Sequence, residues 1–243
     1  MHLLAIETSG PRGGIALATG DAEPTVVEEV RLDERLRHAR DLLPAIRGAC
    51  ERANLAPRDL NALAVSIGPG SFTGLRVAVT LAKVVAWDTG AAVVAVPSLR
   101  AMAENAPPDR PHVACIRDAK RGGLYASLFE RCGEAWEEPF GPALIQPEAL
   151  AERLPPDTLV LGGGVTKARD ALAGFDPAPE DLWDVRPAAV ARLGHALWRA
   201  GETVDPLGLE PIYIRRPEAE EVWERRHGSG TAKDAKSAKR DRL

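Results

Sequence analysis

The segment that most constrains the fold is GPGSFTGLR, residues 68–76, which joins a short apolar strand to a long apolar helix. The strand is predicted over residues 63–67 and the helix over residues 75–88. Glycine lets a backbone approach another group closely, and the first turn of a helix presents free N–H groups with partial positive charge. This arrangement is typical of an anion site. The alternative is a tight turn that presents helix 75–88 to a partner.

The residues before and after this segment predict a mixed sheet. Short apolar runs bounded by turn residues predict three consecutive strands, which we expect to pair as an antiparallel meander. A 3.6-residue apolar period then predicts a helix over residues 39–54. The strand at 63–67, helix 75–88 and a strand at 92–96 form a strand–helix–strand unit with parallel strands and a right-handed crossover. Ser98 is predicted to cap a short helix that ends near Glu104. The three meander strands are expected at residues 2–6, 15–18 and 25–32.

Three prolines within residues 105–111 interrupt this pattern and mark the predicted domain boundary. Beyond them the outline repeats, which indicates a duplicated α/β fold with two subdomains. We expect subdomains at residues 1–106 and 107–227, followed by a disordered basic tail at 228–243. The second half is predicted to contain strands at 113–117, 124–129 and 158–161, a tight turn at 118–123, and helices at 147–153 and 188–200.

Composition excludes several classes of protein. The formal net charge is −4, and five basic against two acidic residues in the tail leave residues 1–227 at −7, so the body is not a basic nucleic-acid platform. Cys50, Cys115 and Cys132 lack CxxC spacing and are interpreted as small buried residues in a reducing compartment. No leader peptide is apparent and no apolar run reaches the ~20 residues that span a bilayer, so we expect a cytoplasmic location.

Several motifs occur together in an order that resembles the TsaB (YeaZ) family. The most specific is the segment GPGSFTGLR already described. The others are individually weaker, and the similarity covers residues 1 to about 226. These weaker motifs are LLAIETS at 3–9, His38 ahead of DLLPAI at 41–46, VPSL at 96–99 and DAKRG at 118–122. One departure is Glu7, because Asp is common at this position of the family.

The resemblance implies an actin/Hsp70/sugar-kinase-like (ASKHA) fold, which is a duplicated ribonuclease-H-like fold. It also implies a non-catalytic subunit that binds and activates TsaD, the catalytic subunit that makes threonylcarbamoyladenosine at position 37 of tRNA. Contact with the ATPase TsaE and with tRNA would occur through the complex. No cofactor is required by this reading, and ATP or ADP would bind at the level of the complex.

A metal site is not expected. Catalytic relatives in this superfamily use two histidines in an HxxxH motif, and such spacing places both imidazoles on one helical face. Here the corresponding positions are Ser98 and Met102, which are poor ligands for a hard or borderline cation. This absence also argues against a glycoprotease-like metallopeptidase.

Nucleotide binding stays open as an alternative. The loop at 68–76 is neither a P-loop nor a dinucleotide fingerprint, and the triple glycine at 162–164 is more simply a strand-to-helix turn. A magnesium-nucleotide-dependent ATPase or small-molecule kinase of the same fold would use Glu7, Asp118 and the two glycine loops. Asp118 and Arg121 are interpreted as a family-motif turn with a salt bridge. Candidate nucleotide- or anion-binding residues are Glu7, Thr8, Ser9, Gly70, Ser71, Gly163 and Gly164.

The sequence favours a protein-binding surface on helix 75–88. Apolar residues occupy nearly every face of this helix, so more than one side must be covered. Helix 39–54 is its natural neighbour, and two such helices could pair with two from a partner. Without that partner we expect a homodimer. Predicted interface residues are Leu42, Leu43, Ile46, Leu75, Arg76, Val79, Lys83, Val84 and Trp87. Val79→Asp or Val84→Asp should abolish complex formation while the monomer stays folded.

Overall fold

Short strands, the inner ones buried along almost their whole length, build the first of two five-stranded sheets. In this computed structural model, which describes residues 1–32, 38–133 and 135–215, the first sheet has the order β3-β2-β1-β4-β5. The strands β1, β2 and β3 are antiparallel neighbours, and β4 and β5 add in parallel on the other side of β1. The predicted meander and parallel unit are therefore confirmed. The strands are β1 His2–Glu7, β2 Gly14–Thr19, β3 Thr25–Arg31, β4 Ala62–Ser66 and β5 Ala92–Val96.

The second sheet repeats this pattern. Its order is β10-β9-β6-β7-β8, with β6 central, β7 and β8 antiparallel on one side, and β9 and β10 parallel on the other. Strand for strand, β6 corresponds to β1, β7 to β2 and β9 to β4. The predicted duplicated ribonuclease-H-like α/β fold is thus confirmed. The strands are β6 His112–Asp118, β7 Leu124–Cys132, β8 Ala135–Ile145, β9 Leu159–Leu161 and β10 Asp176–Pro177.

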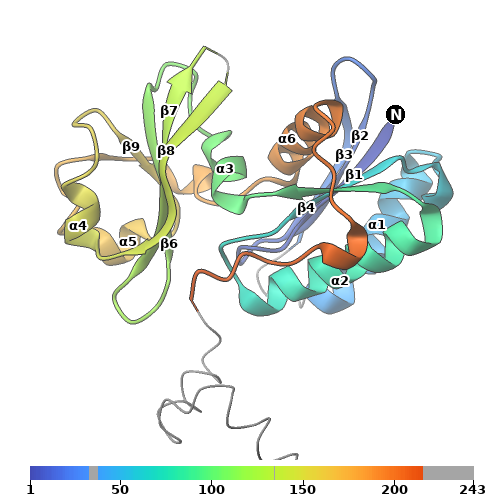
Figure 1. Ribbon diagram of the computed structural model, residues 1–243, viewed down its shortest axis with the longest axis horizontal. Helices are drawn as coiled ribbons and strands as arrows, with labels where there is room; N and C mark the ends of the chain where they lie inside the picture. The colour runs from blue at the N-terminus through green and yellow to red at the C-terminus, as the bar shows by residue number, and fades with distance from the viewer. Residues whose placement is uncertain (33–37, 134, 216–243) are drawn as a thin grey trace, which may run out of the picture. The chain divides into compact units, whose positions relative to one another are not determined.

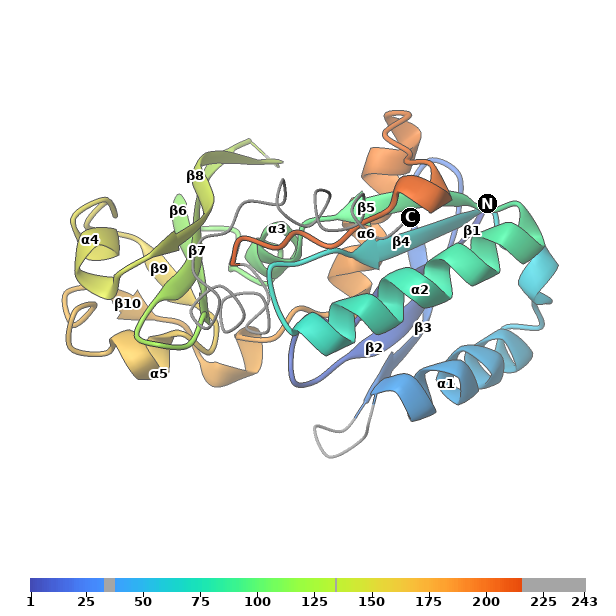
Figure 2. The same cartoon turned by 60° about the horizontal axis from the view of Figure 1, so that its bottom comes forward.

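Helices cover both faces of the first sheet. α1 (His38–Arg52) and α2 (Phe72–Thr89) pack on one face, and α6 (Pro187–Arg199) packs on the other (Figures 1 and 2). α4 (Pro147–Ala151) and α5 (Val165–Ala168) contribute to the core on one face of the second sheet. The remaining helical elements in the described residues are α3 (Ser98–Ala103) and the 3₁₀ turns η1 (Pro57–Asp59), η2 (Glu180–Leu182) and η3 (Pro206–Gly208). None of the helices in the described part of the chain is long and apolar enough to cross a membrane.

Side chains alternate between two core regions along each strand, as a pleated sheet requires. In β1, Leu4 and Ile6 face α1 and α2, whereas Leu3 and Ala5 face α6. The α6 side of the first sheet shares one continuous apolar cluster with α3 and with β6 residues such as Cys115. One hydrophobic core therefore joins the two sheets.

The contacts of the chain group Met1–Ile212 into one unit that contains both sheets, and Tyr213–Leu243 into another. Although α6 follows the second sheet in sequence, it packs on the first. A division at residues 106 and 107 separates the strands of the two sheets but not the helices that cover them. The boundaries 1–106 and 107–227 remain predictions, and the predicted tail at 228–243 lies outside the described residues.

Four local predictions differ from the structure. α2 begins at Phe72 rather than near residue 75, because Ser71 caps it and Gly74 lies inside its first turn. Ser98 is not an N-cap: its hydroxyl accepts a hydrogen bond from the Gly68 N–H at 2.9 Å instead. Cys132 is exposed at the end of β7, whereas Cys50 and Cys115 are buried as predicted. The strand β8 was not predicted at all.

Candidate functional site

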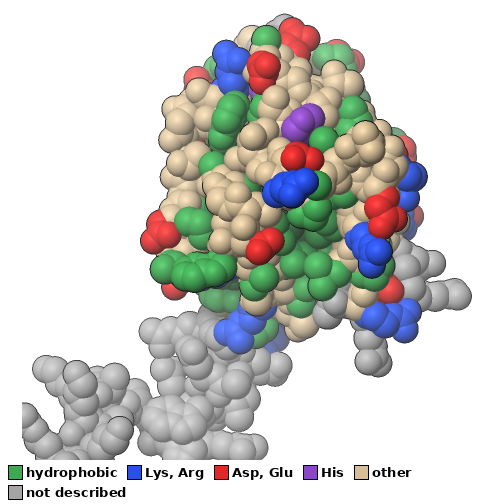
Figure 3. All heavy atoms as spheres, turned by 90° about the vertical axis from the view of Figure 1, so that its right-hand side faces the viewer, with side chains coloured by type: hydrophobic (Ala, Val, Ile, Leu, Met, Phe, Trp, Pro, Cys, Tyr) green, Lys and Arg blue, Asp and Glu red, His purple; other side chains and the backbone are tan. Residues whose placement is uncertain are grey.

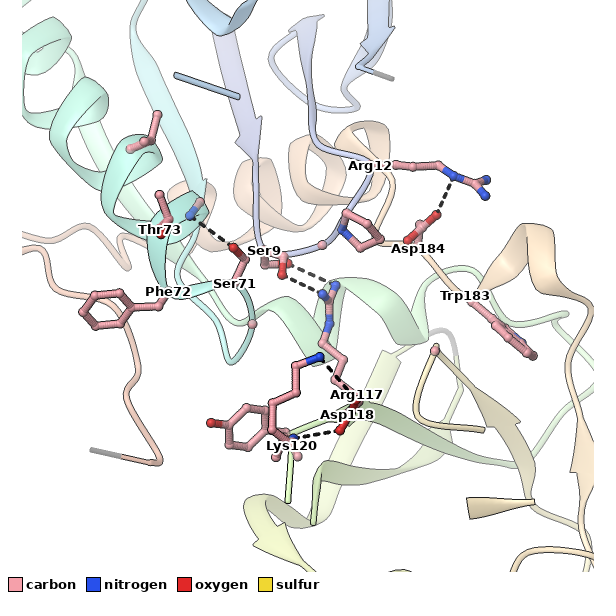
Figure 4. A pocket seen from close by; sticks show the side chains of 18 of the residues that line it. Ser9, Arg12, Ser71, Phe72, Thr73, Arg117, Asp118, Lys120, Trp183 and Asp184 are labelled. Atoms are coloured by element: carbon pink, nitrogen blue, oxygen red, sulfur yellow. Dashed lines mark hydrogen bonds and ion pairs between the residues drawn. The ribbon is translucent and has the colours of Figure 1, made fainter. Parts of the chain in front are cut away.

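A cleft of about 1100 Å³ is the main candidate site in the described residues (Figure 4). The loop after β1 and the first turn of α2 form one side of it. The hairpin between β6 and β7, the turn after β9 and the segment that follows η2 form the other. Lining residues include Ser9, Arg12, Ser71, Arg117, Asp118 and Gly163. The cleft therefore collects loops from the ends of central strands of both sheets.

Glu7, at the end of β1, is fully buried and organises the first loop. Its Oε1 accepts hydrogen bonds from the Ser9 N–H at 2.6 Å, from the Ser9 hydroxyl at 2.5 Å and from the Gly10 N–H at 3.3 Å. One oxygen of this carboxylate is therefore committed to its own loop, whereas Oε2 is buried with no hydrogen-bond partner among the described residues. All three predicted residues of this loop, Glu7, Thr8 and Ser9, are buried, and only Ser9 among them lines the cleft.

The glycine loop packs directly on this first loop. A Cβ at Gly74 would lie 2.0 Å from the Thr8 carbonyl oxygen, and one at Gly70 would lie 2.3 Å from the Ser9 carbonyl oxygen. The Ser71 N–H donates to the Ser9 carbonyl at 2.8 Å, and the Ser71 hydroxyl caps α2 by accepting from the Gly74 N–H at 3.3 Å. Two glycines of the signature are thus required by contact between backbones. The first turn of α2 still lines the cleft.

Arg117, which sequence reasoning did not single out, crosses the cleft. Its Nη1 donates to the Ser9 carbonyl at 2.7 Å and its Nη2 donates to the Ser9 hydroxyl at 3.1 Å (Figure 4). Burial lowers the pKa of Arg117, while the negative charges of Glu7 and Asp184 oppose that shift. The available signal was a charged residue at the end of an otherwise apolar strand, since buried charges are normally paired.

The predicted family-motif turn lies beside Arg117. Asp118 accepts from the Lys120 N–H at 2.7 Å and pairs with the Lys120 ammonium at 3.4 Å. Lys120, Arg121 and Gly122 all have positive φ, so this is a tight left-handed turn. Asp118 and Lys120 line the cleft, and Arg121 is exposed on the turn. The salt bridge that the structure places on Asp118 thus comes from Lys120.

The second glycine turn supports the structural interpretation more than a nucleotide site. Gly162 has φ +107°, and a Cβ there would lie 2.1 Å from the Ile116 carbonyl oxygen. A Cβ added at Gly163 would meet nothing within 4 Å, and this residue lines the cleft, whereas Gly164 packs near Ile116 and does not line it. Of the seven predicted binding residues, the cleft therefore brings together Ser9, Gly70, Ser71 and Gly163.

The two positions that correspond to the metal ligands of catalytic relatives are both in the interior. Ser98 is fully buried and bonded to Gly68, and Met102 is fully buried in the shared core. Among the described residues, no group of three or more His, Cys, Asp or Glu side chains is placed to hold a metal ion.

The nine predicted interface residues divide between the core and the surface of α1 and α2. Leu42, Ile46, Leu75 and Val79 are buried in the chain's own core. Lys83 donates to the Leu207 carbonyl at 2.9 Å, which fastens η3 beside α2. The guanidinium of Arg76, an exposed residue, lies 4.1 Å from the centre of the Phe72 ring. The exposed members, Leu43, Arg76, Val84 and Trp87, are therefore on the outer side of the two helices.

That outer side carries large exposed hydrophobic side chains, which we call the α2 face. Trp87 is 83% exposed, Val84 is 60% exposed and Leu43 on α1 is 56% exposed. Two more residues of the face were missed by the sequence: Phe72, and Leu207 of η3, which is 71% exposed. Figure 3 shows hydrophobic side chains gathered low on the end of the molecule it presents, at the height at which Figure 1 places α1 and α2.

Comparison with known proteins assigns the family. The family model described as TsaD, tRNA N6-adenosine threonylcarbamoyltransferase, matches residues 32–173. The Bacillus subtilis (strain 168) protein named tRNA threonylcarbamoyladenosine biosynthesis protein TsaB is 33% identical over 233 residues, which cover 92% of this chain and 98% of the relative. This chain belongs to the TsaB family. The TsaB protein of Escherichia coli (strain K12) is 29% identical over 88% of this chain and 95% of its own length.

Two solved structures share the fold of this chain. A structure of YeaZ from Pseudomonas aeruginosa matches with a TM-score of 0.74 at 24% identity, covering 87% of this chain and 99% of that one. A second Pseudomonas aeruginosa structure, described as similar to peptidase YEAZ, matches with a TM-score of 0.75 at 25% identity, covering 88% of this chain and 99% of the other. The duplicated fold is thus shared across nearly the whole length of these two chains.

Proposed function

We propose that this protein acts in the biosynthesis of tRNA threonylcarbamoyladenosine, as a non-catalytic subunit that binds and activates a TsaD-type catalytic subunit. Membership of the TsaB family supports the pathway, since the curated relatives carry its name. The replacement of both ligand positions by Ser98 and Met102 supports a non-catalytic role, because neither buried side chain supplies a metal ligand.

The observation that carries the binding role is the exposed α2 face. Contiguous exposed apolar side chains are uncommon on soluble monomers and mark interaction surfaces. Trp87 is the strongest anchor candidate, because tryptophan is enriched among residues that dominate binding energy. On the same helix, Val84 precedes it by three residues and Phe72 is exposed at the first turn, while Leu43 is exposed on α1 and Leu207 on η3. Burying this face against two helices of a partner would extend the core that α1 and α2 already form.

The test compares two exposed valines. Val84→Asp places a charge within the α2 face, whereas Val27→Asp places the same charge on β3, the edge strand of the first sheet, where Val27 is 44% exposed. We expect Val84→Asp to weaken binding to the TsaD-type subunit of the same organism at least ~100-fold, as loss of a hot spot does. Val27→Asp should bind like the unsubstituted protein in isothermal titration calorimetry.

Unchanged binding by Val84→Asp and by Trp87→Ala, with both variants folded by circular dichroism, would reject the α2 face as the docking surface. Val79→Asp is unsuitable as a test because Val79 is buried, and an unpaired charge there should unfold the chain. Of the interface residues predicted from the sequence, only the exposed ones are therefore kept in the proposed docking surface.

Other members of the assembly are proposed through the complex. An ATPase of the TsaE type, with ATP or ADP, and the tRNA substrate would be bound by the assembled subunits, with all components in the cytoplasm. Without its partner the protein would pair with a second copy through the α2 face, since an apolar patch is self-complementary about a two-fold axis. As a non-catalytic subunit, this chain alone would show no threonylcarbamoyl transfer.

A magnesium-nucleotide ATPase or kinase is the alternative, and the cleft is the observation that favours it. Ser9, the first turn of α2, Gly163 and Asp118 line one cavity. Its support is weaker, because Glu7 is buried with Oε1 committed to its own loop and Arg117 spans the cleft to Ser9. Phosphate release from ATP by the isolated chain, lost in Asp118→Ala, would favour this alternative over the assembly subunit.

A further inference from the structure

Arg117 makes a charged contact across the cleft, in addition to the ion pairs of Asp184 with Arg12 at 3.5 Å and with Arg31 at 3.8 Å. Arg117 lies near the end of β6, the central strand of the second sheet, and both of its hydrogen bonds go to Ser9 in the loop after β1. An arginine keeps its charge in proteins, so these are charge-assisted bonds. A group of the protein therefore bridges the two sides of the cleft.

Ser9 passes this contact on to α2. Its carbonyl oxygen accepts from two donors at once, the Arg117 guanidinium at 2.7 Å and the Ser71 N–H at 2.8 Å. Ser71 is the N-cap of α2, and the Thr8 hydroxyl donates to the Gly74 carbonyl at 2.7 Å in the same turn. With Gly70 and Gly74 pressed on this loop, the start of α2 cannot shift without the loop.

Glu7 holds Ser9 from the other side. The Ser9 hydroxyl donates to Glu7 Oε1 and accepts from Arg117 Nη2, so one hydroxyl joins a buried carboxylate to a guanidinium. A serine hydroxyl has one hydrogen to donate and lone pairs with which to accept, so both bonds can form at the same time. The chain Glu7–Ser9–Arg117 is thus a connected network, and such networks hold geometry more strongly than isolated bonds.

We propose that Arg117 is a positioning residue for partner binding: it ties the second sheet, through Ser9, to the first turn of α2 and so fixes the α2 face that begins at Phe72. This inference rests on the proposed docking role of that face. It gives the second sheet a part in binding although it contributes no residue to the face. Removing the guanidinium should loosen Ser71 and Phe72 while leaving Trp87 in place on the helix.

The experiment measures two quantities on each variant of the full chain. One is amide hydrogen exchange at residues 71–73, which does not depend on any partner, and the other is affinity for the TsaD-type subunit. For Arg117→Ala we expect exchange at Ser71 to speed up about tenfold and affinity to fall about tenfold, the change that follows from losing one to two hydrogen bonds. Arg117→Lys should retain one donor to Ser9 and recover part of both effects.

Two comparisons separate positioning from general damage. Arg153→Ala removes an arginine of the second half that stacks over Phe140 and does not touch Ser9, so both readouts should stay unchanged. Ser9→Ala keeps the carbonyl acceptor and the backbone N–H bond to Glu7 but removes the hydroxyl that joins Glu7 to Arg117. It should reproduce the faster exchange if Arg117→Ala proves too unstable to measure. Trp87→Ala should lower affinity while exchange at Ser71 stays the same.

The outcomes distinguish this inference from the proposed function. Unchanged exchange at residues 71–73 in both Arg117→Ala and Ser9→Ala would overturn the positioning role whatever the partner does. Faster exchange with unaltered affinity would overturn its link to binding. If the unsubstituted protein fails to bind the TsaD-type subunit, the proposed function fails, and faster exchange in the Arg117 variant would still support the contact with α2.

Discussion

The two sheets have the same strand order but very different helices. At corresponding connections the first sheet carries α1 with 15 residues and α2 with 18, whereas the second carries α4 with five and α5 with four. The equivalent loops differ as well. Glu7, the last residue of β1, is buried and bonded within the loop that follows, while Asp118, the last residue of β6, pairs with Lys120 and lines the cleft.

This difference shows what each half of the fold supplies. Long helices create surface as well as core, so the first sheet alone supplies the α2 face with its exposed Trp87 and Val84. The second sheet has short helices and supplies the β6–β7 hairpin, from which Arg117 reaches across to Ser9. Duplication of a fold therefore need not duplicate its function: one copy presents a surface and the other fixes a loop of the first.

The largest expected effect is a difference in stability between alanine substitutions in the two glycine turns. Gly74→Ala would place a Cβ 2.0 Å from the Thr8 carbonyl, far inside van der Waals contact with backbone that cannot move aside easily. We expect a loss beyond the roughly 1–3 kcal/mol of ordinary overpacking, and little folded protein at 37 °C. Gly163→Ala in the second turn meets nothing within 4 Å and should change stability by less than about 1 kcal/mol. Urea unfolding of both variants measures the contrast, and similar losses would contradict this packing explanation.

Most regular elements could be predicted from the sequence because their apolar periods are strong. The strand over Ala92–Val96 was predicted to the residue, and the strand order of the meander followed from its short turns. The start of α2 was missed because a glycine inside a helix is unfavourable, and only its contact with Thr8 explains why Gly74 is there. Ser98 was misjudged because its partner, Gly68, is remote in sequence.

The strand β8 could not be predicted because Pro139, Gly141 and Pro142 break its pattern. Prolines are tolerated there since β8 is an edge strand with irregular register against β7. The candidate site was predicted in part. Local motifs identified Ser9, Ser71 and Asp118, but Arg117 acquires its role only when the two sheets meet, and Cys132 is exposed because of where its strand ends.

A smaller effect should distinguish the inner and outer sides of the helices on the first sheet. Leu42 and Leu43 are adjacent in α1, yet Leu42 is buried against the sheet and Leu43 is 56% exposed. We expect Leu42→Ala to cost about 3 kcal/mol of unfolding free energy, as core truncations do, and Leu43→Ala to cost less than about 0.5 kcal/mol. Thermal denaturation gives both values. Binding to the TsaD-type subunit should respond in the opposite order, and a binding defect confined to Leu42→Ala would contradict the assignment of the α2 face.

The smallest expected effect concerns the pH dependence of stability, to which the central strand of the second sheet contributes a buried thiol and that of the first does not. Cys115 is the fourth residue of β6, as Ala5 is of β1, and both belong to the shared core. Burial raises the pKa of the Cys115 thiol well above its ordinary value of 9.0, so above pH 9 the unfolded chain releases this proton while the folded chain keeps it. Stability is therefore fully present below pH 9 and falls as pH rises from there, with a limiting slope of about 1.4 kcal/mol per pH unit for one thiol.

Replacing Cys115 by alanine, the residue that β1 has at the equivalent position, should remove that share of the slope between pH 9 and 10. Cys132→Ala is the matched control, because Cys132 is exposed and its pKa is raised mainly by a hydrogen bond with Glu137 rather than by burial. Guanidinium titrations at several pH values give the slope for each variant. Equal changes in the two slopes would mean that burial of Cys115 in the shared core does not cause the loss of stability above pH 9. The second sheet would then gain no pH sensitivity from carrying a thiol where the first carries a methyl group.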